Sequence, residues 1–132
     1  MSAVIDTNVL IFDTFEDSQF HGEARRGLDS IARWHFPDIV FHEFFWFFKS
    51  ENIQLSRARL KMEEYLTNEK TVFSPCAPDD IRFASNEITN YSDYNDFVIL
   101  SIAKRLELPL FTFDRELARK AARKDVRIVS SG

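Results

Sequence analysis

Short apolar segments with the character of β-strands alternate along this chain with longer segments of helical periodicity. Strands separated by helices pair in parallel through right-handed crossovers, and helices then cover both faces of the sheet. The sequence therefore predicts an α/β fold, a three-layer α/β/α sandwich with a central, mostly parallel sheet. The expected strands are residues 3–5, 34–40, 70–73, 108–113 and 126–129. The expected helices are residues 8–15, 19–33, 41–48, 55–66, 95–106 and 115–124, with one more that begins at Pro78.

Pro37 interrupts the second expected strand. Proline cannot donate a backbone hydrogen bond to a neighbouring strand, so it is disfavoured inside a sheet. We therefore expect the strand in this segment to start nearer Asp38, directly before an aromatic helix over residues 41–48.

A chain of 132 residues has the usual size of one domain, which we place at residues 1–132. The composition, 45% hydrophobic and 29% charged, is typical of soluble proteins, and no apolar run approaches the roughly 20 residues that span a bilayer. The N-terminus lacks the pattern of a signal peptide, and Cys76 alone offers no disulfide framework. We therefore expect a cytoplasmic protein without membrane contact.

The charge of the chain is distributed unevenly. The formal net charge is −4, but residues 104–127 hold eight basic and four acidic side chains, which gives this segment a net charge of +4. Such a segment is compatible with an anionic partner on one face of an acidic protein, and equally with a solvated helix face.

Four acidic residues stand where a parallel sheet would bring them to one edge. Asp6 follows the first strand, and Asp114 follows the strand that ends at residue 113. Glu43 is expected in the first turn of the helix after the second strand, and Asp96 in the first turn of the helix before the fourth. Ligands bind at this edge of α/β sheets. Grouped carboxylates raise one another's pKa unless a cation neutralises them, and oxygen ligands select Mg²⁺ or Mn²⁺.

Helix capping is the alternative explanation for three of these acids. Asp6, Asp96 and Asp114 all precede or open helices, where a short acid accepts hydrogen bonds from free backbone N–H groups. Glu43 is different, because it lies among Phe and Trp residues and no Lys or Arg precedes it within one helical turn. A buried carboxylate without a partner is costly, which favours a shared metal site.

Four short motifs then resemble those of the PIN-domain family, in the family's order and over essentially the whole chain. They are VIDTN at residues 4–8, Glu43, ND at residues 95–96 and LFTFD at residues 110–114. The resemblance implies a sheet of parallel strands and a metal-dependent ribonuclease of single-stranded RNA. It most often implies the toxin of a VapBC-type toxin–antitoxin pair, and it implies homodimers.

The resemblance also assigns roles to individual residues. The residues matching the family's catalytic and metal-binding acids are Asp6, Glu43, Asp96 and Asp114, and those matching its supporting polar positions are Asn8 and Thr112. Asp93 lies three residues before Asp96 and shares its helix face, so either could be the metal ligand. We favour Asp96, because the apolar segment 97–100 begins directly after it. Asp93 would then cap the helix or hold a metal-bound water.

Two surfaces are candidates for macromolecular partners. Basic residues fill one half of the helix expected at residues 115–124 and begin beside Asp114, so we expect them to bind RNA phosphates. These residues are Arg115, Arg119, Lys120 and Arg123. The aromatic helix is expected to be buried on the broad face of Phe41, Phe44, Phe45 and Phe48. Trp46 and Phe47 lie on its other side, where we expect a dimer interface or an antitoxin groove.

The sequence thus predicts a Mg²⁺- or Mn²⁺-dependent endoribonuclease that hydrolyses single-stranded or loop RNA, acts as a VapBC-type toxin and forms a homodimer. One alternative is a catalytically silent PIN-like module that binds RNA or protein. Another is an RNA-processing nuclease that is not a toxin. A phosphotransferase with an aspartyl intermediate at Asp6 is disfavoured, because that chemistry would call for an acid at position 8 or a nearby lysine, and position 8 is Asn.

Overall fold

A parallel sheet of four short strands lies at the centre of the computed structural model, which describes residues 1–129. The strands are β1 (Ser2–Ile5), β2 (Arg33–Phe36), β3 (Thr71–Phe73) and β4 (Leu110–Phe111), and their order in the sheet is β3-β2-β1-β4. The register pairs Val4 of β1 with His35 on one side and with Leu110 on the other. The predicted parallel α/β architecture is confirmed.

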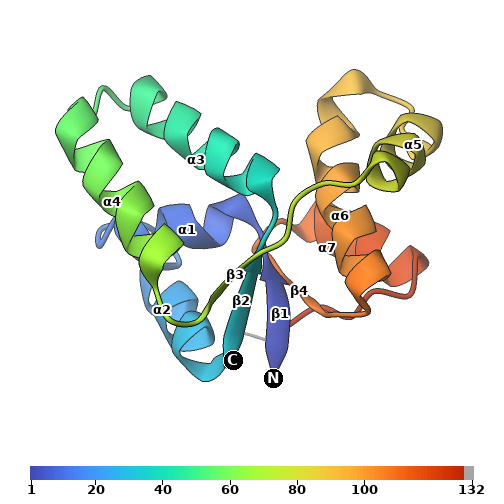
Figure 1. Cartoon of the computed structure of the whole chain (residues 1–132), viewed down its shortest axis with the longest axis horizontal. Coiled ribbons are helices and arrows are strands. Elements are labelled where there is room, and N and C mark those ends of the chain that lie inside the picture. The colour runs from blue at the N-terminus through green and yellow to red at the C-terminus, as the bar shows by residue number, and fades with distance from the viewer. Residues whose placement is uncertain (130–132) are drawn as a thin grey trace.

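Seven α-helices flank this sheet in two groups. They are α1 (Thr7–Thr14), α2 (His21–Ser30), α3 (Asp38–Ser50), α4 (Leu55–Thr67), α5 (Pro78–Glu87), α6 (Tyr94–Leu106) and α7 (Arg115–Arg123), and a 3₁₀ turn, η1 (Tyr91–Asp93), precedes α6. Figure 1 shows α1 to α4 on one side of the sheet and α5 to α7 on the other, with α3 and α6 rising on either side of an opening above the strands. None of these helices is long and apolar enough to span a membrane.

The core forms where the short strands meet the most apolar helix. Ala3, Val4 and Ile5 of β1 are fully buried, as expected for a central strand covered on both faces. Every residue of α6 from Phe97 to Ala103 is buried. Gly27 of α2 lies so close to β4 that a Cβ atom there would stand 2.2 Å from Cζ of Phe111.

A buried carboxylate stabilises each group of helices. Asp13 of α1 accepts a hydrogen bond of 2.6 Å from the hydroxyl of Tyr65 on α4. Asp80 of α5 accepts one of 2.9 Å from Nη2 of Arg105 on α6. Both carboxylates are therefore paired within their own half of the molecule, away from the upper end of the sheet.

The prediction that the second strand starts near Asp38 is wrong. The strand β2 ends at Phe36, and α3 begins at Asp38, directly after Pro37. The fixed φ angle of proline and its missing N–H suit the start of a helix rather than a strand. Glu43 consequently lies in the second turn of α3, not in the first as predicted.

Two predicted strands at the C-terminal end are shorter than expected. The strand β4 covers only Leu110–Phe111, because Leu108 donates its backbone N–H to Ala103 at the end of α6, and Thr112 already turns toward the next helix. The predicted strand over residues 126–129 contributes one isolated parallel bridge, between Ile128 and Leu110.

The aromatic helix α3 is less enclosed than predicted. Phe41, Phe44 and Phe48 are buried as expected, but Phe45 is 37% exposed. Trp46 is 62% exposed, in agreement with its place outside the broad face. Phe47 is half-buried, because its ring packs edge-on against Phe15 at 5.8 Å between centroids.

Candidate functional site

Asp6 directly follows the C-terminal end of β1 and lies beside the C-terminal end of β4. Its backbone N–H donates to the carbonyl oxygen of Phe111, at 3.0 Å, so the sheet itself fixes this residue. The carboxylate is only 5% exposed and accepts hydrogen bonds from the Thr7 N–H, at 2.8 Å, and from the Thr112 hydroxyl, at 2.7 Å. Asp6 thus caps α1 and at the same time faces the rim of the sheet.

Thr112 and Asn8 connect the first strand to the loop after β4. The Thr112 hydroxyl accepts hydrogen bonds from Nδ2 of Asn8, at 3.3 Å, and from the backbone N–H of Asp114, at 3.0 Å. Oδ1 of Asn8 accepts the N–H of Phe113, at 3.2 Å. The two polar residues expected to support the acids therefore lie in direct contact with the segment that carries Asp114.

Asp114 caps α7, as its position suggested. Its Oδ1 accepts hydrogen bonds from the backbone N–H groups of Glu116 and Leu117, at 2.9 and 3.2 Å. The capping explanation is therefore correct for Asp6 and for Asp114, whereas Asp96 makes no such bond. Capping does not exclude a second role, because Asp114 also faces Asp96 closely enough to raise its pKa.

Glu43 has two hydrogen-bond donors that sequence reasoning missed. Its Oε1 accepts the hydroxyl of Thr7, at 2.5 Å, and its Oε2 accepts Nδ2 of Asn95, at 3.2 Å. The carboxylate therefore has protein hydrogen-bond partners in addition to any cation that it would share with the other acids. Thr7 directly follows Asp6, and Asn95 directly precedes Asp96. Their positions next to two predicted site residues could have indicated that they lie near Glu43.

The acids influence one another electrostatically. Burial, with smaller contributions from the charges of Asp96 and Glu43, raises the pKa of Asp6 to about 7, against the hydrogen bonds from Thr112 and Thr7. Burial and then the charge of Asp114 raise the pKa of Asp96 to about 6. The charge of Glu43 thus acts on both Asp6 and Asp96, and the charge of Asp114 acts on Asp96.

Asp93 and Asp96 have different neighbours, although one helix face was predicted to carry both. Asp93 ends the 3₁₀ turn η1 and forms an ion pair of 3.3 Å with Lys120 of α7. Asp96 is turned toward the other acids, and the charges of Asp114, Glu43 and Asp93 all raise its pKa. Lys120 lowers it, so this lysine stands close to the acids as well.

The other basic residues of α7 remain on the surface. Arg115, Arg119 and Arg123 are exposed, and Arg119 pairs with Glu116 on its own helix. Lys120 is therefore the one predicted RNA-binding residue whose contacts, within residues 1–129, reach the acidic rim.

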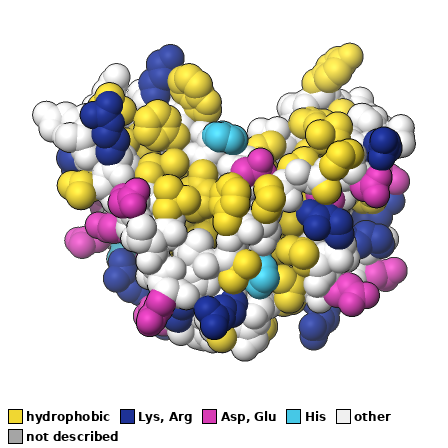
Figure 2. Space-filling model, viewed as in Figure 1, with side chains coloured by type: hydrophobic (Ala, Val, Ile, Leu, Met, Phe, Trp, Pro, Cys, Tyr) yellow, Lys and Arg dark blue, Asp and Glu magenta, His cyan; other side chains and the backbone are white. Residues whose placement is uncertain are grey.

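The donor set fits a hard divalent cation, because every candidate ligand is a carboxylate oxygen. Within residues 1–129, however, no three Asp, Glu, His or Cys side chains lie close enough to hold one ion as they stand. Mg²⁺ usually needs only one or two protein carboxylates, because water molecules complete its coordination. Figure 2 shows the molecule hollowed between its two halves, with acidic, histidine and hydrophobic side chains in the hollow.

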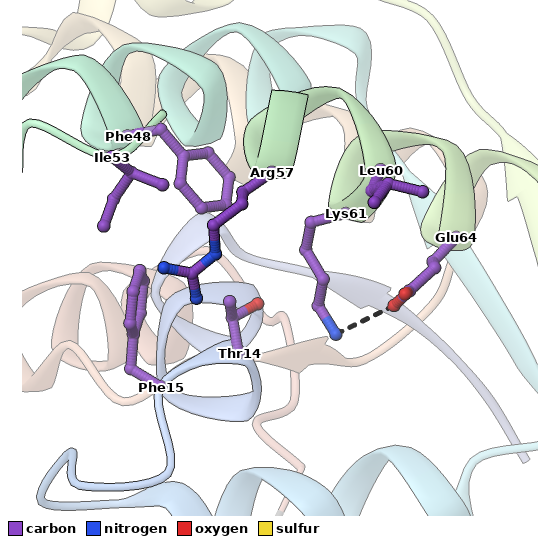
Figure 3. Close-up of a pocket in the computed structure, with 8 residues that line it drawn as sticks. All are labelled: Thr14, Phe15, Phe48, Ile53, Arg57, Leu60, Lys61 and Glu64. Carbon is purple, nitrogen blue, oxygen red and sulfur yellow. Dashed lines mark hydrogen bonds and ion pairs between the residues drawn. The ribbon is translucent and has the colours of Figure 1, made fainter. Parts of the chain in front are cut away.

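A second hollow, of about 240 Å³, lies away from these acids between α1 and α4 (Figure 3). Its apolar walls are Phe15, Phe48, Ile53 and Leu60, and its polar lining is Thr14, Arg57, Lys61 and Glu64. Arg57 extends from α4 toward Phe15 and Thr14. Lys61 pairs with Glu64, but within the described part of the chain Arg57 makes no ion pair.

Several solved toxin structures share this fold. VapC20 of Mycobacterium tuberculosis, a Sarcin-Ricin loop cleaving toxin, has a TM-score of 0.77 and 14% identity over 90% of this chain and 95% of that chain. VapBC2 of Rickettsia felis, bound to a DNA fragment from its promoter, has a TM-score of 0.72 and 13% identity over 98% of both chains. A toxin–antitoxin complex from Klebsiella pneumoniae has a TM-score of 0.69 and 21% identity over 99% of this chain and 98% of that chain.

The family is established by sequence rather than by these distant structures. No curated protein sequence matches the chain. The family model for the PIN domain, in contrast, matches residues 3–123, which include all seven helices, β2 to β4 and β1 except for Ser2. PIN domains are typically nucleases. The chain belongs to the PIN domain family.

Proposed function

We propose that this protein is a metal-dependent endoribonuclease and the toxin of a VapBC-type toxin–antitoxin pair. The observation that carries the proposal is the meeting of four carboxylates at the end of the sheet in a PIN domain. These carboxylates belong to Asp6, Glu43, Asp96 and Asp114. Two of them have pKa values raised toward neutrality, which is typical of sites that bind a cation or transfer protons.

Mg²⁺ or Mn²⁺ would be held by these four acids. Such an ion supplies a water of lowered pKa and neutralises charge on the phosphate. Of the two candidates, Asp93 in η1 and Asp96 in α6, we favour Asp96 as the ligand, because Asp93 is engaged with Lys120. Asn8 and Thr112 keep Asp6 and the loop to Asp114 in place through their hydrogen bonds.

Single-stranded or loop RNA is the proposed substrate. The basic residues that would contact its phosphates are Arg115, Arg119, Lys120 and Arg123. Exposed Arg115 and Arg123 make no ion pair within residues 1–129, so their guanidinium groups are available for such contacts. Phosphate contacts of this kind weaken as salt is added. VapC20, which shares the fold, is described as a Sarcin-Ricin loop cleaving toxin.

The proposal is tested by incubating purified protein with single-stranded RNA, hairpin RNA, duplex RNA and single-stranded DNA. Each substrate is assayed with Mg²⁺, with Mn²⁺ and with excess chelator. We expect cleavage of the single-stranded or hairpin RNA that requires metal and stops in chelator. Binding of these RNAs without any metal-dependent cleavage would instead support the silent module, and cleavage of DNA alone would refute the choice of substrate.

Metal affinity should depend on pH, because protons compete with the cation for Asp6 and Asp96. Their pKa values of about 7 and about 6 mean that both carboxylates carry protons in mildly acidic solution. We expect the Kd for Mn²⁺ to fall by about tenfold or more between pH 5.5 and 7.5 and to level off above pH 8. Calorimetric titration at four pH values measures this. A Kd that stays constant over the range would contradict the assignment of these two acids.

An antitoxin is the proposed protein partner, and we place one of its contacts in the hollow between α1 and α4. The hollow joins apolar walls to a guanidinium group, Arg57, that has no carboxylate partner within residues 1–129. This chemistry suits a peptide segment in which an apolar side chain is followed by an acidic one. One of the solved structures with this fold, from Klebsiella pneumoniae, is a toxin–antitoxin complex.

Reversing the charge of Arg57 should therefore weaken the complex. We expect Arg57→Glu to lose about 100-fold in affinity for the proposed antitoxin, since a close charge pair becomes a repulsive one. The matched control is Arg59→Glu, which changes an exposed arginine of the same helix that does not line the hollow. Surface plasmon resonance compares the two. Equal losses in both variants would contradict the placement of the contact.

A homodimer and a cytoplasmic location remain predictions. Light scattering of the purified chain measures the first. Of the two residues predicted to form an interface, only Trp46 is still a strong candidate, because its side chain is exposed. The ring of Phe47 packs against Phe15 within the same chain.

A further inference from the structure

The carboxylate of Glu43 is held by one donor on each of its oxygens. Thr7, on α1, donates to Oε1, and Asn95, in the first turn of α6, donates to Oε2. Within residues 1–129 no other side-chain hydrogen bond joins α3 to α6. Asn95 is therefore the polar link between the two helices that stand on opposite sides of the opening in Figure 1.

Two donors from different helices prevent the carboxylate from rotating. A carboxylate oxygen has two lone pairs, so each oxygen of Glu43 that accepts one hydrogen bond can still bind a cation. The charge of Glu43 contributes to raising the pKa of both Asp96 and Asp6, so its carboxylate lies near both acids. The hydrogen bonds thus hold Glu43 toward the acids with which it would share an ion.

We infer that Asn95 is a positioning residue, which orients Glu43 for the divalent cation. This inference rests on the proposed metal-dependent function. An amide suits the task because it donates a hydrogen bond and carries no charge. A lysine or arginine at position 95 would neutralise Glu43 and compete with the ion. An aspartate there would repel the carboxylate of Glu43. Residues that orient metal ligands in this way typically change metal affinity by about 10- to 100-fold when they are replaced.

The contact itself is tested without metal. Side-chain amide resonances of Asn95 are recorded in an ¹⁵N–¹H NMR spectrum of the metal-free protein and compared with those of Glu43→Gln. We expect these resonances to move in Glu43→Gln and to stay in place in the control Glu63→Gln, which changes an exposed glutamate of α4. Resonances that are unaffected by Glu43→Gln would overturn the inference.

The functional consequence is tested by calorimetric titration of the metal-free chain with Mn²⁺. We expect the Kd of Asn95→Ala to rise about tenfold, with an unchanged Kd in the control Asn86→Ala, which alters an exposed residue of α5. In a Glu43→Ala background, Asn95→Ala should cause no further loss, because it acts through Glu43.

The outcomes separate the inference from the proposed function. A normal Kd in Asn95→Ala, or an equal loss with and without Glu43, would overturn the positioning role and leave the nuclease proposal intact. A wild-type chain that binds no Mn²⁺ would overturn the metal-dependent function and the inference with it. If Asn95→Ala does not fold, the spectra of Glu43→Gln, in which Asn95 is unchanged, decide the question.

Discussion

Asp6→Asn is expected to lower kcat/KM for RNA by about 100-fold or more, which corresponds to roughly 3 kcal/mol of transition-state stabilisation. Asp6 is the acid fixed by the sheet, through its backbone bond to Phe111, and asparagine has the same size but no charge with which to hold a cation. The Thr7 N–H can still donate to the asparagine oxygen. The loss should therefore come from lost metal binding and not from unfolding.

The stability of the same variant distinguishes these two causes. The raised pKa of Asp6 means that the unfolded chain, in which this acid has its ordinary pKa of 3.8, loses the proton first as pH rises. Asp6 therefore stabilises the metal-free fold fully below pH 4, and this contribution is lost as pH rises toward 7. In Asp6→Asn that loss is absent. We expect its Tm at pH 8, in chelator, to be at least that of the wild type.

The control for both measurements is Asp17→Asn, an exposed aspartate after α1. It should leave cleavage and Tm unchanged. Full metal-dependent cleavage by Asp6→Asn would remove Asp6 from the site. A strongly lowered Tm at pH 8 would show instead that the lost activity reflects a damaged fold.

Gly27→Ala is expected to destabilise the fold more than alanine at Gly22, the other glycine within residues 1–129. Its Cβ would stand 2.2 Å from Cζ and 2.5 Å from Cε2 of Phe111, far inside van der Waals contact. Phe111 is fully buried in β4 and cannot move aside. Overpacking of this kind costs about 1–3 kcal/mol or more, and Tm should fall by about 10 °C. Cleavage should fall too, because Phe111 directly precedes Thr112.

Gly22→Ala provides the matched control in the same helix. Its Cβ would meet only the flexible side chain of Arg26, at 3.2 Å, and alanine favours the helix over glycine by up to about 1 kcal/mol. We expect Tm to stay equal or to rise slightly. Similar losses of Tm in Gly22→Ala and Gly27→Ala, measured by differential scanning calorimetry, would refute the packing argument.

The sequence predicted the sheet because its signals are local. An apolar run followed by a helix indicates a parallel strand wherever it occurs, and β1 and β3 lie close to their predicted ranges. The prediction failed at Pro37, where two local rules compete: proline ends a strand, and it also starts a helix. The choice between them depends on packing of the aromatic side chains in α3, which no local pattern determines.

The sequence could predict which acids belong to the candidate site, but not their hydrogen-bond partners. Topology alone brings Asp6 and Asp114 to one edge, since both follow parallel strands. The partners of Glu43 were not predicted, because Thr7 and Asn95 are 36 and 52 residues away from it in sequence. The pairing of Asp93 with Lys120 depends likewise on how α7 packs against α6.

The hydrogen bond from Thr112 to Asp6 joins residues 106 positions apart, nearly the two ends of the chain. Contacts of such long sequence separation form late, because the intervening chain must first be ordered. During synthesis on the ribosome, β1 therefore emerges long before its neighbour β4. A growing polypeptide that ends before residue 114 lacks Asp114, and one that ends before residue 96 lacks Asp96 as well. The proposed site can therefore be completed only after residue 114 has been added to the growing chain.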